Sequence, residues 1–427
     1  MREPDSTRRT FLKQSAATTA VAAATQLGLA ANAHAGGGET LNVGLIGCGG
    51  RGTGAAEQAM TADKGAKLVA MADAFKDQLD ASLSALKGGP SGSQVDVPAD
   101  RQYVGFDAYK AVIDQSDVVL LTTTPHFRPI HLAYAIEKGK HVFMEKPVAT
   151  DAPGVRAVFA ACEEAAKKGL SVASGFCWRS HQPRRETMKR VFDGAIGDIV
   201  AVETTYNSNG VWDPRRSREQ CASEMEYQLR NWYYYEWLSG DHIVEQAIHG
   251  IDTMNWALGD KPPIRCWGSG GRQVRTDPAY GNIYDHFSIV YEYPGDVRGY
   301  HNCRHWQGCA VQVKDYVLGA KGTCDVFGNK ISGAEKWAYR GPKSDMYQTE
   351  HDELFAAIRA GKPLNNGASA ARSTLLAIMG RMAAYTGEAI TWEMALNSKE
   401  SLGLKEYAWG AEVPHRPVPR PGVTKFA

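Results

Sequence analysis

One run of residues sets the architecture of this chain: Leu41-Asn42-Val43-Gly44-Leu45-Ile46-Gly47-Cys48-Gly49-Gly50-Arg51-Gly52. The first six residues are mostly apolar and predict a buried parallel strand. Gly47, Gly49 and Gly52 form a G-x-G-x-x-G motif, and residues 53–61 predict a helix. A glycine motif alone is often an ordinary turn, but a strand before it and a helix after it indicate a dinucleotide-binding unit.

Each glycine of the motif has a separate task. Gly47 allows the tight turn, Gly49 lets a pyrophosphate approach the backbone, and Gly52 permits close packing of helix on strand. The helix N-terminus then presents free N–H groups to the phosphates. A second predicted strand, residues 67–72, ends at Asp73, where a carboxylate would bind the adenosine ribose and repel a 2′-phosphate. We therefore expect the cofactor to be NAD rather than NADP.

The rest of the first domain continues the alternation of strand and helix. Strands are predicted at residues 117–121, 141–144 and 170–175, and helices at 129–138 and 153–168. This order is that of a doubly wound α/β sheet, in which ligands bind beyond the carboxyl ends of the strands.

The glycine motif and the second half of this domain together resemble the glucose–fructose oxidoreductase / inositol dehydrogenase / rhizopine-catabolism (Gfo/Idh/MocA) oxidoreductase family. The residues that carry the resemblance are Thr124-Pro125, His131, Ala135, Gly139-Lys140-His141-Val142 and Glu145-Lys146-Pro147. The resemblance covers nearly all of the mature chain. It implies an α/β fold with a Rossmann domain, which we place at residues 36–176. An α/β domain with a large, mainly antiparallel open sheet would follow at residues 177–405.

The resemblance also implies roles for residues of the first domain. Lys146 would bridge cofactor and substrate, Glu145 would contact the nicotinamide-side ribose, and the Lys146–Pro147 bond would be cis. An isolated lysine is more often solvated, but an ammonium at a strand end can stabilise negative charge on a sugar oxygen. The predicted cofactor contacts are Gly47, Gly49, Arg51, Gly52, Asp73, Thr124, Pro125, His131, Glu145 and Lys146.

A helix predicted from Ser239 to Asp252 carries the candidate general base, His249. Ser239 or Asp241 would cap this helix. Glu245 and His249 would be i,i+4 neighbours, so that the carboxylate orients the imidazole and raises its basicity. In the family pattern an Asp and a His four residues apart contact the substrate hydroxyls. Glu245 stands in place of that Asp, which moves the carboxylate by one methylene.

Two alternatives compete with a catalytic role for this helix. Its polar stripe could be a solvated face, although such a face carries histidine less often than lysine, arginine or glutamate. His242, Glu245 and His249 could also ligate a metal, but the chain supplies no other obvious ligands. We favour the catalytic role and expect no metal.

Aromatic and arginine residues concentrate at residues 206–237, directly before this helix. Aromatic rings pack against the C–H faces of sugars, and arginine binds hydroxyls or a carboxylate. An oligomer contact is an equally good interpretation, because interfaces favour the same residue types. The predicted substrate contacts are Arg179, Trp212, Arg230, Trp232 and Asp252.

The second half of the chain predicts a sheet and a terminal arm. Strands are expected at residues 264–274, 284–293, 297–305, 311–319 and 322–327. They suit an antiparallel sheet with one face free for a partner subunit, and hence a homo-oligomer. Residues 406–427 are proline-rich and predict an extended arm.

The N-terminus has the pattern of an export signal. Thr7-Arg8-Arg9-Thr10-Phe11-Leu12-Lys13 matches a twin-arginine motif, and Ala33-His34-Ala35 is a cleavage site. A weak membrane anchor is the alternative, but the Ala- and Thr-rich stretch is too short for a stable spanning helix. We therefore assign residues 1–35 to a signal that engages the twin-arginine export machinery. Cleavage near Ala35 would release the protein into the periplasm.

Bulk composition excludes some classes of function. The 427 residues carry a net charge of +1, which gives no support for nucleic-acid or membrane-surface binding. The eight cysteines include no C-x-x-C pair, so a structural zinc or redox dithiol is not expected. Twin-arginine substrates fold before export, so most of the thiols should be free and buried.

Three functions remain open at this stage. The first is an exported NAD-dependent oxidoreductase acting on a sugar or sugar derivative, with catalytic residues Lys146, Glu245 and His249. The second is a redox-neutral glycosidase that oxidises the sugar, eliminates the glycosidic bond and reduces the product with the same NAD. The third is a non-catalytic sugar-binding protein. Because NAD is made in the cytoplasm, export favours a tightly bound cofactor that travels with the folded protein.

Overall fold

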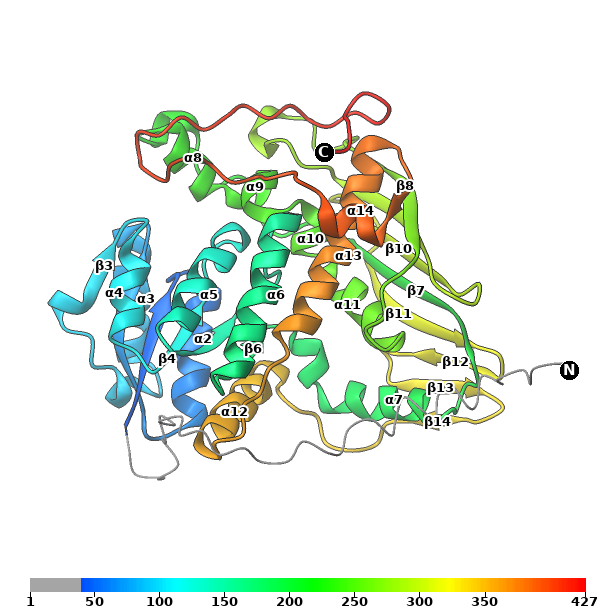
Figure 1. The fold of residues 1–427 in the computed structure, drawn as a ribbon, viewed down its shortest axis with the longest axis horizontal. Helices are drawn as coiled ribbons and strands as arrows, with labels where there is room; N and C mark the ends of the chain where they lie inside the picture. The colour runs from blue at the N-terminus through cyan, green and yellow to red at the C-terminus, as the bar shows by residue number, and fades with distance from the viewer. Residues whose placement is uncertain (1–39) are drawn as a thin grey trace, which may run out of the picture. The chain divides into compact units, whose positions relative to one another are not determined.

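A computed structural model describes residues 40–427, so the predicted export signal lies outside the described residues. The first sheet is parallel, with strand order β3-β2-β1-β4-β5-β6 (Figure 1). Its strands are β1 (Leu41–Ile46), β2 (Ala66–Asp73), β3 (Gln102–Val104), β4 (Val118–Leu121), β5 (His141–Met144) and β6 (Val172–Ser174). The connecting helices are α2 (Gly50–Ala62), α3 (Lys76–Gly88), α4 (Ala108–Asp114), α5 (Arg128–Glu137) and α6 (Ala152–Lys167).

The apolar runs of these strands are buried because helices cover both faces of a parallel sheet. Val43, Leu45, Val119 and Leu120 are fully buried. Strand order reverses between β1 and β4, which is the point where ligands bind in sheets of this kind. The predicted Rossmann sheet is confirmed.

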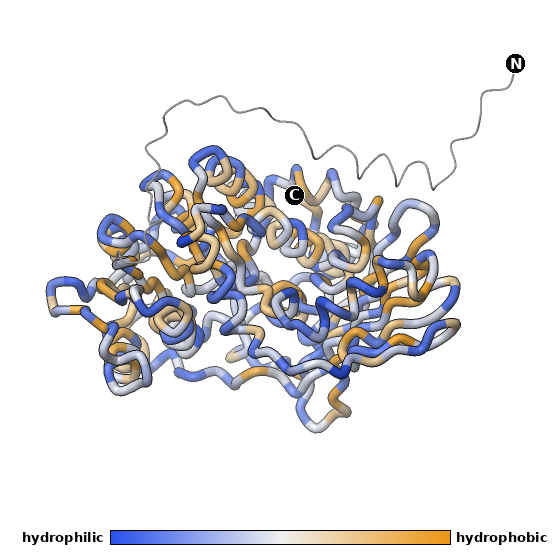
Figure 2. The backbone as a smooth tube through the Cα atoms, turned by 90° about the horizontal axis from the view of Figure 1, so that it is seen from below, coloured by the Kyte–Doolittle hydropathy of each residue, from blue (hydrophilic) through white to orange (hydrophobic). Residues whose placement is uncertain are grey.

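The second sheet has the strand order β14-β13-β12-β11-β7-β10-β9-β8-β15. All of its pairings are antiparallel except that of β10 with β7, as predicted for a large, mainly antiparallel sheet. The backbone in this sheet changes repeatedly between hydrophilic and hydrophobic residues (Figure 2). Its strands are β7 (Ile199–Ser208), β8 (Arg265–Gly271), β9 (His286–Glu292), β10 (Arg298–His305), β11 (Gln312–Gly319), β12 (Gly322–Asp325), β13 (Lys330–Gly333), β14 (Trp337–Ala338) and β15 (Ile390–Thr391).

Of the helices in the second half, α11 and α13 lie between the two sheets (Figure 1). Helix α13 is buried along most of its length and packs against α6, α11 and β8. The helices of the second half are α7 (Gln182–Phe192), α8 (Glu224–Arg230), α9 (Glu236–Ser239), α10 (His242–Glu245), α11 (Ile248–Ala257), α12 (Met346–Arg359), α13 (Gly367–Thr386) and α14 (Trp392–Asn397). Short 3-10 turns used below are η3 (Pro125–Phe127), η4 (Cys177–Ser180) and η6 (Trp232–Tyr234).

The single helix predicted from Ser239 to Asp252 is wrong. Helix α9 ends at Ser239 because Gly240 adopts a left-handed conformation with φ of 80°. Asp241 then caps α10 by accepting a hydrogen bond from the backbone N–H of His242. Helix α10 ends at Glu245, and α11 begins only at Ile248. Glu245 and His249 therefore lie on different helices.

The C-terminal arm, residues 406–427, contains neither helix nor strand and runs across α8 and α9 (Figure 1, red). Tyr284 donates a hydrogen bond to the Pro419 carbonyl at 2.9 Å, and the Gly422 N–H donates to Thr386 at 2.8 Å. The predicted extended arm is thus held against the second domain.

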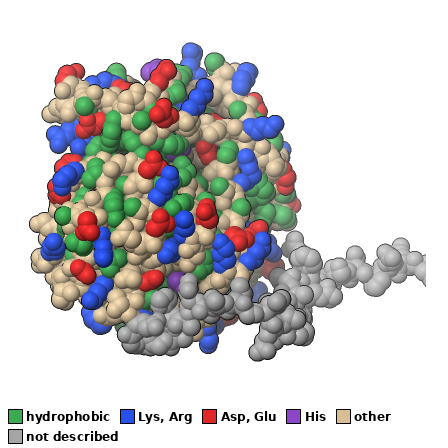
Figure 3. Space-filling view, turned by 60° about the vertical axis from the view of Figure 1, so that its left-hand side comes forward, with side chains coloured by type: hydrophobic (Ala, Val, Ile, Leu, Met, Phe, Trp, Pro, Cys, Tyr) green, Lys and Arg blue, Asp and Glu red, His purple; other side chains and the backbone are tan. Residues whose placement is uncertain are grey.

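All eight cysteines are free, and six of them are buried, as expected. Within residues 40–427, no helix is long and apolar enough to cross a membrane. On the face shown in Figure 3, basic and acidic side chains are interspersed.

Candidate active site

The glycine turn between β1 and α2 leaves room at the helix N-terminus. A Cβ on Gly47, whose φ is 96°, would lie 2.5 Å from the Thr123 nitrogen, and a Cβ on Gly52 would lie 1.9 Å from the Gly47 oxygen. A Cβ on Gly49 or Gly50, by contrast, would meet no atom within 4 Å. Two glycines are therefore required by packing and two border open space, an arrangement that fits the phosphates of a dinucleotide.

The Asp73 carboxylate accepts a hydrogen bond from the backbone at the glycine turn. One carboxylate oxygen accepts a hydrogen bond from the Cys48 N–H at 2.6 Å, and the other accepts from the Phe75 N–H at 2.8 Å. Burial raises the pKa of Asp73 above its usual range. Each oxygen keeps a second lone pair, so the predicted contact with a ribose hydroxyl stays a prediction.

The loop after β4 closes the other side of the turn. Thr122 Oγ1 donates to the Gly47 carbonyl at 2.6 Å. The hydroxyl of Thr124, directly before Pro125, is buried and has no hydrogen-bond partner within the described residues. A buried hydroxyl without a partner is costly unless a ligand completes its bonds. Thr124 is therefore well placed for a ligand contact.

His131 occupies a packing position in α5. Its ring stacks on Tyr109 with centroids 4.2 Å apart, and burial lowers its pKa to about 3. Its observed contacts are with rings of the first domain, so the structure gives no support for the predicted cofactor contact.

Glu145 joins the end of β5 to the glycine turn. Its carboxylate lies 2.7 Å from Nε of Arg51, and Glu145 is only 4% exposed. The Arg51 guanidinium also lies over the Tyr347 ring of α12, 5.0 Å from its centroid. The two predicted cofactor contacts Glu145 and Arg51 are thus brought together.

Lys146 crosses from the first domain to the second. The Lys146–Pro147 bond is cis, as the resemblance implied. Nζ of Lys146 donates to the Glu245 carbonyl at 2.6 Å and to its carboxylate at 3.2 Å. Both side chains are largely buried, at 13% and 11% exposed, so solvent screens this ion pair only weakly.

His249 is buried beside this ion pair. Its ring stacks on Trp178 with centroids 4.8 Å apart, and its Nδ1 has no hydrogen-bond partner within residues 40–427. Burial, followed by the nearby cations Lys146 and Arg184, holds the pKa of His249 well below its usual range. The imidazole is therefore neutral at neutral pH and can accept a proton.

The predicted hydrogen bond between Glu245 and His249 is not formed. The break between α10 and α11 removes the i,i+4 relation, and Glu245 pairs with Lys146 instead. The structure also does not bring His242, Glu245 and His249 together as ligands of one metal ion. No group of three or more His, Cys, Asp and Glu in the described part of the chain could hold an ion. His242 stacks on His305 at 4.3 Å and hydrogen-bonds Tyr233.

Arg179 and Asp252 bind each other rather than facing an open site. Arg179 Nη2 lies 2.8 Å from Asp252 and 2.7 Å from Asp260, and Asp252 also accepts from Ser373 at 2.7 Å. This network fixes η4 against α11. Both residues therefore have structural contacts, and their predicted contacts with the substrate stay predictions.

Only part of the aromatic segment at residues 206–237 lies near the candidate site, where Tyr206 accepts a hydrogen bond from Gln246 at 2.6 Å. Trp212 and Trp232 pack on each other with centroids 6.1 Å apart, within a cluster that includes Tyr233 and Tyr234. Arg230 forms an ion pair with Asp77 of the first domain at 2.7 Å. The predicted substrate contacts Trp212, Arg230 and Trp232 are therefore not brought to the candidate base. Tyr206 and Tyr233, by contrast, lie near Glu245: burial raises the pKa of both hydroxyls, and the charge of Glu245 adds to the rise.

Trp178 and Arg184 were not predicted as site residues. The Arg184 guanidinium lies 3.9 Å from the centroid of the Trp178 ring, which also stacks on His249. Arg184 is on α7, whose run of charged residues indicates a solvated helix. Its burial depends on contacts with distant parts of the chain, including Phe327.

Two family models match this chain. Residues 41–176 match a model described as an oxidoreductase family with an NAD-binding Rossmann fold, and residues 185–325 match the GFO/IDH/MocA C-terminal domain. Together the two matched segments span more than half of the chain.

Two curated relatives resemble this chain at less than 30% sequence identity. The chain is 22% identical to 2,7-anhydro-N-acetylneuraminate hydratase of Escherichia coli over 261 residues, which are 60% of this chain and 64% of the relative. It is 29% identical to inositol 2-dehydrogenase of Rhizobium meliloti over 250 residues, which are 58% of this chain and 64% of the relative. The chain thus spans less than two thirds of the length of either relative.

A solved structure of aldose-aldose oxidoreductase from Caulobacter crescentus, complexed with glycerol, has a similar fold. The TM-score is 0.64 at 19% sequence identity, and the match covers 83% of this chain and 100% of that one. At this identity the likeness establishes the fold alone.

Proposed function

Because the chain belongs to the Gfo/Idh/MocA oxidoreductase family, we propose that it is an exported NAD-dependent oxidoreductase acting on a sugar or sugar derivative. One observation carries the proposal. Lys146 at the end of β5, its partner Glu245 and the neutral His249 meet beside the open glycine turn. Inositol 2-dehydrogenase, a relative by sequence, is named for a polyol substrate, which supports the substrate class.

The residues of the glycine turn would hold the cofactor. The open space at Gly49 and Gly50 would take its phosphates, Asp73 its adenosine ribose, and Thr124 an oxygen on the opposite side. A carboxylate at position 73 disfavours a 2′-phosphate, so we propose NAD over NADP. When bound, NAD supplies a hydride acceptor for the carbinol carbon of the substrate.

The protein's own residues handle the proton and the charge. His249, being neutral, takes the proton of the substrate hydroxyl. The Lys146 ammonium binds the same oxygen and stabilises the negative charge that develops on it. Glu245 holds the ammonium in position through its carbonyl and carboxylate.

Replacing Lys146 or His249 by alanine tests these roles. Each variant should lose at least about 10²–10³-fold in kcat, the usual cost of removing one donor that stabilises developing charge. Bound NAD should remain, because the glycine turn, Asp73 and Glu145 are left in place to hold it. Lys138→Ala, at an exposed lysine directly after α5, is the matched control and should keep full turnover. Loss of NAD from both variants would show that the two roles are misplaced.

A redox-neutral glycosidase is the second candidate. It is favoured by the relative named as a hydratase, a reaction class without net oxidation or reduction. Reduction of the bound NAD by a sugar, reversed only when a second substrate is added, supports the oxidoreductase with resident NAD. Steady accumulation of NADH on addition of free NAD would contradict a resident cofactor. Release of the chromophore of an aryl glycoside, without net NADH, supports the glycosidase. A non-catalytic sugar-binding role would leave the buried Lys146–Glu245 pair beside His249 without a purpose.

We propose that NAD is loaded in the cytoplasm and remains bound through twin-arginine export to the periplasm. This proposal is supported by the motif at Arg8 and Arg9 and by the absence of NAD synthesis outside the cytoplasm. A protein purified from the periplasm should therefore carry stoichiometric NAD, measured by its absorbance after denaturation.

We also propose that the outer face of the second sheet binds another copy of the chain. Trp267 on β8 and Tyr300 on β10 both pair with Val290 on β9, and they are 37% and 41% exposed. Large apolar side chains that cross neighbouring strands favour burial in an interface. Light scattering should show an oligomer that Trp267→Arg dissociates.

A further inference from the structure

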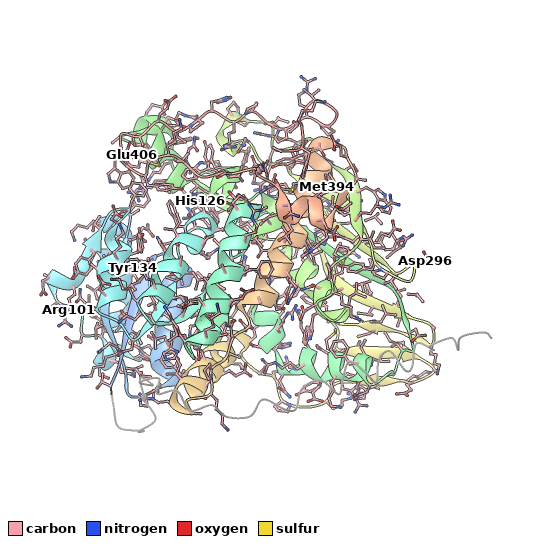
Figure 4. All side chains as sticks on the ribbon, in the orientation of Figure 1. Arg101, His126, Tyr134, Asp296, Met394 and Glu406 are labelled. Atoms are coloured by element: carbon pink, nitrogen blue, oxygen red, sulfur yellow. The ribbon has the colours of Figure 1, made fainter. Side chains whose placement is uncertain are left out.

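Three phenylalanines follow consecutive strands of the Rossmann sheet and are covered by the C-terminal arm. Phe75, Phe106 and Phe127 come after β2, β3 and β4. Trp409 packs on Phe75 and Phe106, with ring centroids 5.2 and 4.9 Å apart, and Tyr407 packs on Phe127 at 5.3 Å. Glu406, the residue before Tyr407, lies beside α8, at the end of the molecule where the arm crosses that helix (Figure 4).

Helix α8 also contacts the Phe75 ring, through Arg230. The Arg230 guanidinium lies over Phe75, 3.8 Å from the ring centroid. It also pairs with Asp77 through two hydrogen bonds of 2.7 and 3.1 Å, and Asp77 is in the first turn of α3. We call Arg230 together with residues 407–409 the clasp.

The clasp covers the adenosine end of the dinucleotide site. Phe75 is two residues beyond Asp73, and its N–H donates to the Asp73 carboxylate at 2.8 Å. His126, in η3, links the loop after β4 to the arm through a 2.7 Å hydrogen bond with Tyr407 (Figure 4). Both loops that would border an adenosine are therefore tied to the clasp.

We propose that the clasp closes the adenosine end of the cofactor site and slows the release of NAD. This inference rests on the proposed function, because it assumes that NAD occupies the glycine turn. Arg230 and Trp409 would act as positioning residues that hold the two loops, without taking part in the chemistry.

The contacts of the clasp are weak enough for it to open while the rest of the protein stays folded. Trp409 is 38% exposed, and the Asp77 side chain is 53% exposed. Exposed ion pairs and cation–π contacts are individually weak. The arm contains no helix or strand at residues 406–427, so its displacement breaks no regular structure.

The test is the rate at which NADH leaves the purified full-length mature protein. Bound NADH is followed by its fluorescence after addition of excess NAD, in the parent and in Arg230→Gln, Asp77→Asn and Trp409→Ala. Arg218→Gln is the matched control, because Arg218 also combines an ion pair, with Glu224, and a cation–π contact, with Tyr227, but does so within its own segment. Unfolding midpoints are measured alongside without nucleotide.

Each clasp variant should release NADH at least about tenfold faster than the parent, and Arg218→Gln should release it at the parental rate. Double replacement of Arg230 and Asp77 should be no faster than Arg230→Gln alone, because that variant already removes the contact with Asp77. Faster release with an unchanged unfolding midpoint distinguishes a cover from a purely structural contact. If all clasp variants release NADH at the parental rate, the role proposed for the clasp is wrong, whereas the proposed function is unaffected. A parent that binds no NADH would overturn the proposed function as well.

Discussion

His249 is the residue whose behaviour depends most on its surroundings. Its low pKa comes from burial and from the cations Lys146 and Arg184. A general base is active when deprotonated, so activity is lost as the pH falls through its pKa. Removing a cation makes the protonated form less unfavourable and raises that pKa.

Arg184→Gln should therefore shift the acid limb of the kcat/KM profile to higher pH, because Arg184 is one of these two cations. Arg185→Gln, on the same helix, is the control, since Arg185 pairs with Glu353. An acid limb at the same pH in both variants would show that His249 is not the titrating base.

Single residues differ in how well the sequence predicts them. Lys146 and Glu145 were placed at a strand end because the strand, its end and the next helix are all local in sequence. The partner of Glu245 was predicted wrongly, since two residues between α10 and α11 change which side chains face each other. Trp178 and Arg184 could not be predicted, because their contacts with His249 and Phe327 join segments far apart in the chain.

At the scale of elements, two glycines of the turn between β1 and α2 serve different purposes. Gly52 is needed for packing, and Gly49 borders the space proposed for NAD. Gly52→Ala places a Cβ against the Gly47 oxygen and should cost about 1–3 kcal/mol of unfolding free energy, as overpacking does. Gly49→Ala meets no protein atom, so it should leave stability unchanged and weaken NAD binding at least about tenfold. Denaturant unfolding and NAD titration of both variants measure the two effects. Equal stability of the two variants would contradict the packing argument.

Strand β10 carries a buried histidine that makes stability depend on pH. His301 is fully buried, its Nδ1 lies 2.7 Å from Thr204 Oγ1, and burial lowers its pKa to about 3. The unfolded chain binds a proton at about pH 6.5 whereas the folded chain does not, so this contribution is complete above pH 6.5 and lost progressively as the pH falls toward 3.

Between pH 7.5 and pH 5, the parent should therefore lose about 2 kcal/mol more stability than His301→Gln. The same substitution at the exposed His415 serves as the control. Parallel stability curves for parent and His301→Gln would contradict this prediction.

The elements themselves were predicted where hydrophobic periodicity is local. The strands and helices predicted in the first domain and five strands of the second sheet match the structure, but α3, β3 and α4 were not predicted. Strand β7 was not predicted, although it lies at the centre of the second sheet. Residues 206–237, which overlap only its end, were interpreted by their aromatic composition. Composition does not indicate which surface a segment covers, and Arg230 lies on Phe75 rather than at the catalytic residues.

At the scale of the whole molecule, the proposed export and the proposed retention of NAD can be tested together. Replacing both Arg8 and Arg9 by lysine should leave folded, NAD-loaded protein in the cytoplasm, because the twin-arginine pathway requires its paired arginines. Fractionation followed by NAD measurement in each compartment tests this, with Arg2→Lys as the control. Unchanged periplasmic protein in the double variant would indicate another export route.

The arm and the loop that it covers are far apart in the chain. Tyr407 and its partner His126 are separated by 281 positions in the sequence. Contacts between such distant residues form slowly during folding, whereas the glycine turn and its helix join neighbouring residues. We therefore expect the proposed NAD site to form before its cover, so that the cofactor enters while the protein is still folding.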